Sequence, residues 1–124
     1  MCGIVGISGV ADAARLAYLG IYALQHRGQE SAGIVAVDAD GTARYHRGMG
    51  LVSETFNESV LDALPGDVAV GHARYSTTGS TVLANAQPCY ANTRSGKLAL
   101  SNSSNLTDKY AVKSETVNEG AIFS

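Results

Sequence analysis

The chain opens with the nonapeptide MCGIVGISG, residues 1–9. Its apolar run from Gly3 to Ser8 is bounded by glycines, is too short for a helix and is rich in β-branched residues, which predicts a buried strand. Cys2 then lies at the mouth of this strand. A strand is a rigid support, so a reactive group at its mouth would be held firmly in place.

Downstream of this strand, helix and strand patterns alternate unevenly. Asp12 is placed to cap a helix that is apolar on most sides and that Gly28 ends, so we expect a buried helix. A turn at residues 38–41 predicts a hairpin between a buried strand over residues 32–37 and a second strand over residues 42–46. The pattern further predicts a short helix beginning at Ser53, strands over residues 67–75 and 97–100, a loop over residues 76–85, a helix capped by Asn105 or Thr107, and the start of a strand at residues 121–124.

Composition excludes several classes of function. With 124 residues, 45% hydrophobic and 16% charged, the chain is typical of one ordinary folded domain. Its net charge is -2 and its basic residues are scattered, so nucleic acid is not an expected partner. No apolar run approaches the about 20 residues that cross a bilayer, and residues 1–9 lack the basic flank of a secretory signal. We therefore expect a cytoplasmic protein without a membrane partner.

The cysteines carry the first indication of chemistry. Cys2 and Cys89 stand outside any CxxC pair and away from spaced histidines, which argues against a disulfide framework and against a metal site. Removal of Met1 would leave a thiol and a free α-amine together on Cys2. The α-amine titrates at about pH 7.7–8.0, so it can accept the thiol proton during attack and return it to the leaving group. A histidine base is then not required.

A cysteine considered without its position is more often a small buried residue than a nucleophile. Here Gly3 follows Cys2 directly and leaves the thiol accessible to a substrate. The position at the start of the chain therefore favours the nucleophile.

Three segments resemble one enzyme family. They are CGIVGISG at residues 2–9, LQHRGQESAGIVA at residues 24–36 and GHARYSTTG at residues 71–79. Together they are similar to the glutaminase domain of the amidophosphoribosyltransferases, which are glutamine amidotransferases with an N-terminal cysteine nucleophile. The resemblance implies an α+β fold, a four-layer αββα sandwich of the N-terminal-nucleophile hydrolase type, of which residues 1–124 would form an incomplete part. It also implies hydrolysis of glutamine to glutamate and ammonia, the step that supplies ammonia in de novo purine biosynthesis.

The same resemblance implies roles for individual residues. Cys2 would be the nucleophile, Arg74 would bind the α-carboxylate of glutamine, and Tyr75 and Thr77 would line the same pocket. The planar fork of a guanidinium matches a carboxylate with two hydrogen bonds, which agrees with the role of Arg74. A solvated surface arginine is the alternative, but Arg74 lies among apolar strand residues.

Arg27 and Gly28 would organise the loops over bound substrate in this family. An Arg-Gly pair after a helix is also an ordinary C-terminal cap, and the two roles are compatible. For His26 and His72 we expect structural roles, because the α-amine already supplies the proton relay.

One loop departs from the family pattern. Where the family has HNGNL, with an asparagine side chain and a glycine amide as the oxyanion hole, this chain has NSSNL at residues 102–106. Ser103 and Ser104 thus occupy these catalytic positions. Removal of one oxyanion donor typically lowers the rate by about 100–1,000-fold. A module that binds glutamine without hydrolysis is therefore a second hypothesis, and a truncated product without independent activity is a third.

Partners and cofactors are also implied by the resemblance. In the family, a phosphoribosyltransferase domain or subunit receives the ammonia, and this chain contains no acidic pair followed by a small-residue phosphate loop. Magnesium and phosphoribosyl pyrophosphate are expected only for that absent domain, so no cofactor is expected in this chain. An iron–sulfur cluster elsewhere in the protein and a homo-oligomer are both left open.

Overall fold

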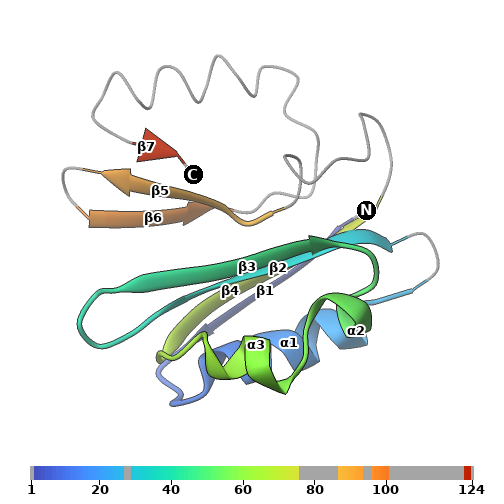
Figure 1. Ribbon diagram of the computed structural model, residues 1–124, viewed down its shortest axis with the longest axis horizontal. Coiled ribbons are helices and arrows are strands. Elements are labelled where there is room, and N and C mark those ends of the chain that lie inside the picture. Colours follow the sequence, from blue (N-terminus) through green and yellow to red (C-terminus); the bar gives the residue numbers. More distant parts are fainter. Residues whose placement is uncertain (1, 27–28, 76–86, 94–95, 101–121, 124) are drawn as a thin grey trace.

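The computed structural model describes residues 2–26, 29–75, 87–93, 96–100 and 122–123, and from residue 89 onward it describes the backbone only. In this part of the chain, helices lie against one face of a larger sheet, and a smaller sheet lies over its other face (Figure 1). The helices are α1 (Ala13–Ala23), α2 (Val52–Thr55) and α3 (Glu58–Asp62). The strands are β1 (Gly3–Ser8), β2 (Gln29–Val37), β3 (Ala43–Met49), β4 (Val68–Tyr75), β5 (Cys89–Thr93), β6 (Gly96–Leu100) and β7 (Ile122–Phe123).

The larger sheet is antiparallel and has four strands in the order β1-β4-β2-β3. Its strands are therefore assembled from segments that are far apart in the sequence, since β1 pairs with β4 rather than with β2. The smaller sheet has the order β6-β5-β7. The prediction of an α+β fold with antiparallel sheets and helices is confirmed at this level.

The two faces of the larger sheet differ in what covers them. Gly3 and Ala73 lie opposite each other on the helical face, where a Cβ added to Gly3 would be 2.9 Å from the side chain of Leu24. Gly33 points to the other face, where a Cβ would lie 2.0 Å from the main-chain oxygen of Gln87. Only glycine allows the Gln87 segment to approach β2 so closely.

Small residues allow α1 to lie close to the sheet. Ala13, Ala14 and Ala17 are buried, and Ile21 is fully buried against Gly71, where a Cβ would be 3.0 Å from the Ile21 Cγ2 atom. This contact joins α1 to the middle of β4, and Ile21 belongs to the hydrophobic core.

The helix predicted after Asp12 is present, but three of its expected features were wrong. It ends at Ala23 rather than near Gly28, because the Leu24 carbonyl and the His26 amide are hydrogen-bonded to the Tyr75 hydroxyl. Asp12 precedes the helix but makes no side-chain capping hydrogen bond. The helix is also not buried on most sides, since an apolar stripe is exposed on its outer surface: Leu16, Leu19 and Tyr22.

The remaining predictions were confirmed in outline. The strand Gly3–Ser8 and the strands beginning near residues 67 and 97 are β1, β4 and β6, and the strand start near the end is β7. The predicted hairpin is longer than expected, and the short helix predicted at Ser53 is two short helices, α2 and α3. Strand β5 was not predicted. The predicted loop over residues 76–85 and the helix capped by Asn105 or Thr107 lie outside the described residues.

Among the described residues, no helix is long and apolar enough to cross a bilayer.

Candidate functional site

Cys2, Arg74 and Ser31 form one row across an end of the larger sheet. The pair Gly3–Ala73 is the last of the β1–β4 ladder, so the antiparallel register places Cys2 opposite Arg74 one residue further on. On its other side, Arg74 is paired with Ser31 of β2. Residues directly opposite in antiparallel strands project from the same face, with Cβ atoms about 4.5–5.5 Å apart. The three side chains therefore share one face of the sheet.

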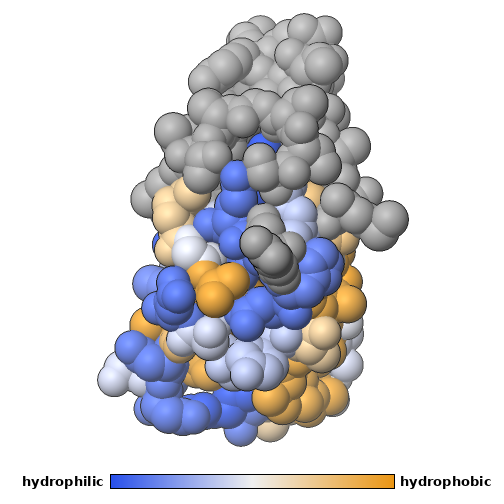
Figure 2. Space-filling model, turned by 90° about the vertical axis from the view of Figure 1, so that its right-hand side faces the viewer, coloured by the Kyte–Doolittle hydropathy of each residue, from blue (hydrophilic) through white to orange (hydrophobic). Residues whose placement is uncertain are grey.

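This shared face is the one directed toward the smaller sheet. Side chains alternate along β4, so Arg74 projects away from the helical face that Ala73 contacts. Arg74 is only 7% exposed, whereas Cys2 is half-buried. Figure 2 views the end of the molecule where the chain begins, and hydrophilic residues gather over the middle of that surface. The register thus brings a half-buried thiol and a buried guanidinium together on one face of the sheet.

Gln29 organises this end of the sheet and was not singled out from the sequence. Its Nε2 atom donates to the Ser31 carbonyl at 2.7 Å and to the Gly50 carbonyl at 2.9 Å. Its Oε1 atom accepts from the Val52 amide at 2.9 Å, at the start of α2. The ladder between β2 and β4 is irregular between Gln29 and Ser31, and this irregularity determines which residue faces Arg74. Its position directly after Arg27 and Gly28, inside the segment LQHRGQESAGIVA, was the available sequence signal.

Tyr75 lies on the opposite face of β4 from Arg74. Its hydroxyl donates to the Leu24 carbonyl and accepts from the His26 amide at 2.9 Å. Its ring stacks on that of His26, with centroids 4.1 Å apart. These contacts tie the end of α1 to the sheet just before Arg27. The structural role expected for His26 agrees with this stacking, and a contact of Tyr75 with glutamine stays a prediction.

Of the other residues considered for the site from the sequence, only His72 lies within the part of the chain that the structure describes. His72 is completely buried on β4, between Ile4 of β1 and Gly33 of β2. Arg27, Gly28, Thr77, Ser103 and Ser104 lie outside the described residues.

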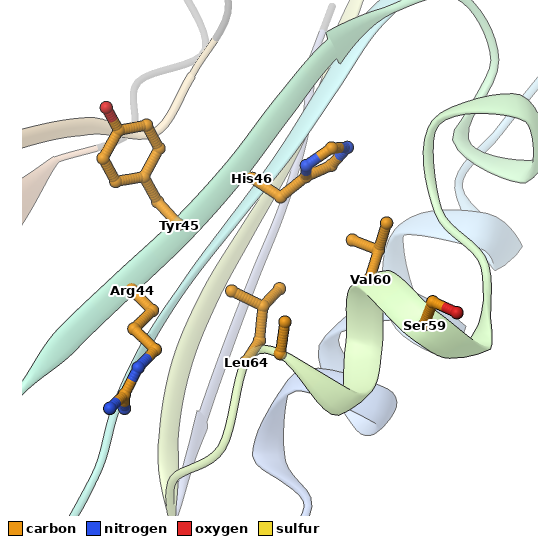
Figure 3. Close-up of a pocket in the computed structure, with 7 residues that line it drawn as sticks. Arg44, Tyr45, His46, Ser59, Val60 and Leu64 are labelled. Carbon is orange, nitrogen blue, oxygen red and sulfur yellow. The ribbon is translucent and has the colours of Figure 1, made fainter.

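A shallow cavity of about 280 Å³ lies on the helical face, between β3 and the α3 region (Figure 3). Neither Cys2 nor Arg74 lines it. Figure 3 shows His46 of β3 and Val60 and Leu64 of the α3 region around it, while Tyr45 points away. His46 Nε2 is hydrogen-bonded to the Thr55 carbonyl at 3.0 Å. The polar groups here serve the local fold, so we assign no chemistry to this cavity.

Arg44 at the rim of the cavity is paired with Asp38 at 2.8 Å, and this hydrogen bond is the main cause of the lowered pKa of the Asp38 carboxyl. Among the described residues, no group of three or more His, Cys, Asp or Glu side chains could hold a metal ion.

The fold matches two solved structures. One is the structure of the allosteric regulatory enzyme of purine biosynthesis, with 40% identity and a TM-score of 0.78. The match covers 99% of this chain and 26% of that chain. The other is glutamine phosphoribosylpyrophosphate amidotransferase from B. subtilis in complex with ADP and GMP, with 40% identity, a TM-score of 0.75 and the same coverage. The class of protein that this chain resembles is therefore the glutamine-dependent amidotransferase.

Sequence comparison leads to the same particular enzyme. The chain is 50% identical over 122 residues to amidophosphoribosyltransferase 2, chloroplastic, of Arabidopsis thaliana. The matched segment covers 98% of this chain and 22% of the Arabidopsis protein. No protein-family profile matches the chain. The expected resemblance to the N-terminal part of the amidophosphoribosyltransferases is confirmed, and the chain spans about a quarter of the length of the relatives that it matches.

Proposed function

We propose that this chain is a glutaminase unit that hydrolyses glutamine to glutamate and ammonia, with Cys2 as its nucleophile. The observation that carries the proposal is the antiparallel register that sets Cys2 opposite Arg74 on one face of the sheet. The similarity to amidophosphoribosyltransferases along 98% of the chain supports it independently.

In the proposed reaction, Arg74 binds the α-carboxylate of glutamine and leaves the side-chain amide near the Cys2 sulfur. After removal of Met1, the α-amine of Cys2 accepts the thiol proton while the sulfur attacks the amide carbon. The C–N bond breaks, the amine returns the proton, and ammonia leaves behind a γ-glutamyl thioester. Water then attacks the thioester, which releases glutamate and regenerates the thiol.

The wider context extends beyond the described residues. We infer that the glutaminase unit adopts the complete four-layer αββα sandwich of N-terminal-nucleophile hydrolases. Its ammonia would pass to a phosphoribosyltransferase domain or subunit, for transfer to phosphoribosyl pyrophosphate in de novo purine biosynthesis. Magnesium would serve that phosphoribosyltransferase part. The proposed compartment is the cytoplasm, whereas the Arabidopsis relative is chloroplastic by name. Assembly into a homo-oligomer is compatible with this function.

The second candidate function is binding of glutamine without hydrolysis. It is favoured by Ser103 and Ser104, which replace the asparagine and glycine of the family's oxyanion loop. Restoring both with Ser103→Asn and Ser104→Gly should raise turnover about 100–1,000-fold if this loop is the only defect. No gain would instead point to parts of the glutaminase unit beyond these residues.

An ammonia-release assay tests the proposal. Mass spectrometry first confirms that Met1 has been removed, and glutamate and ammonia are then measured with glutamine as substrate. We expect turnover that the Cys2→Ala variant loses. Labelling of Cys2 by a glutamine-like electrophile without turnover would favour the binding module, and a chain that neither turns over nor labels would contradict both functions.

A further inference from the structure

Ser31 presents an unused hydroxyl beside the predicted substrate-binding arginine. The residue is 1% exposed, and its Oγ atom has no hydrogen-bond partner within the described part of the structure. A buried hydroxyl without a partner costs about 1–3 kcal/mol, so such groups are uncommon in folded proteins. The position of this hydroxyl therefore calls for a physical explanation.

The surroundings of Ser31 hold it in one place. The Gln29 side chain donates to the Ser31 carbonyl, and the strand partners of Ser31 are Arg74 on β4 and Met49 on β3. Because opposed residues share a face, the Ser31 hydroxyl lies on the side of the sheet that carries Arg74 and Cys2. Across the adjacent strands β1, β4 and β2, the row therefore consists of the Cys2 thiol, the Arg74 guanidinium and the Ser31 hydroxyl.

We propose that Ser31 is a second donor for the α-carboxylate of bound glutamine and so helps to determine affinity for amino-acid substrates. A carboxylate offers about four acceptor positions, and an arginine fork occupies two of them. A neutral hydroxyl on the far side of Arg74 from Cys2 can take a third position without adding charge. The inference rests on the proposed function, since it assumes that Arg74 binds this carboxylate.

The proposal separates two ends of the substrate. The amide end reacts at Cys2, and the charged end is held by Arg74 together with Ser31. Loss of the Ser31 hydroxyl should therefore weaken binding of glutamine. It should leave the stability of the protein unchanged or slightly higher, because an unsatisfied buried group is removed.

The test measures equilibrium binding, so it does not depend on turnover. L-Glutamine is titrated by calorimetry into the full chain carrying Cys2→Ala, alone and combined with Ser31→Ala, Arg74→Ala or Ser8→Ala. Ser8 is an exposed serine at the far end of β1 and serves as the matched control. We expect Ser31→Ala to raise the dissociation constant at least about tenfold and Ser8→Ala to leave it unchanged.

Each outcome decides between the two claims. Weaker binding with Arg74→Ala but unchanged binding with Ser31→Ala would overturn the role of Ser31 and leave the proposed function standing. A Ser31→Ala variant with a lowered melting temperature and an unchanged dissociation constant would make the hydroxyl structural and would also overturn the inference. Absence of glutamine binding in the parent, or no effect of Arg74→Ala, would contradict the proposed function itself.

Discussion

Continued by one residue beyond its last pair, Gly3–Ala73, the β1–β4 register sets Cys2 opposite Arg74. The two residues are 72 positions apart in the sequence. They become neighbours only because β1 pairs with β4. The proposed nucleophile is thereby about one inter-strand distance, 4.7–4.9 Å between backbones, from the arginine proposed to bind the carboxylate of glutamine. This relationship makes the chemistry of Arg74 directly testable.

Substitution Arg74→Lys keeps the positive charge but removes the planar fork. If Arg74 binds the glutamine α-carboxylate with two parallel hydrogen bonds, the lysine variant should bind glutamine about tenfold more weakly. Calorimetry in the Cys2→Ala background measures this directly. Equal affinity for the lysine and arginine proteins would show that only charge, and not the fork, is used.

Gly33→Ala should destabilise the fold through the contact between β2 and the Gln87 segment. The new Cβ would lie 2.0 Å from the Gln87 main-chain oxygen, so the backbone must move, at a cost of about 1–3 kcal/mol. Urea unfolding gives the change in free energy. Gly6→Ala is the matched control, because a Cβ at Gly6 meets nothing within 4 Å and should leave the protein equally stable or more stable. Equal stability of the Gly33→Ala variant and the native chain would contradict the close approach.

Tyr75→Phe removes the hydroxyl that joins Leu24 and His26 to the sheet. The ring and its stacking on His26 remain, so the loss is confined to the hydrogen bonds and should cost about 1 kcal/mol. Thermal unfolding measures the effect. Tyr22→Phe, on the exposed side of α1, should change stability by no more than about 0.5 kcal/mol. If the Tyr75→Phe and Tyr22→Phe variants have the same melting temperature, the hydroxyl of Tyr75 does not hold the end of α1.

Asp38→Asn should destabilise the β2–β3 hairpin in a pH-dependent way. The Asp38 carboxylate accepts from Arg44 Nη1 and from the Asp40 and Thr42 amides, and the Arg44 hydrogen bond is the main cause that lowers its pKa below the usual 3.8. A lowered folded-state pKa means that the stabilisation is fully present above the unfolded-state pKa and is lost as the pH falls through the folded-state pKa.

The difference in stability between native chain and Asp38→Asn should accordingly be constant near neutral pH and disappear in acid. Urea unfolding from pH 7 to pH 2 measures it. The variant Asp40→Asn, at an exposed position of the same turn, should change stability by no more than about 0.5 kcal/mol at neutral pH. A difference for Asp38→Asn that persisted unchanged at pH 2 would show that ionisation is not its source.

Local sequence patterns predicted most of the elements near the candidate site. The glycine-bounded apolar run of β1 and the apolar run of β4 are short-range signals, and both strands were found where they were expected. The end of α1 was misplaced because the Tyr75 hydroxyl, which engages Leu24 and His26, comes from a distant strand. The outer face of α1 was expected to be buried but is exposed. An apolar pattern in the sequence does not show whether another layer of the fold covers that face.

The sequence by itself determined that a cysteine follows the initiator methionine at the mouth of a strand, and that an arginine lies in a later apolar strand. Only the tertiary structure decided that these two residues are opposite each other and that Ser31 completes their row. Strand order and register depend on contacts between remote segments, and an irregularity of one residue at Gln29 changes which side chain faces Arg74. Such contacts leave no periodic trace in the chain, so they appear only once the sheet has assembled.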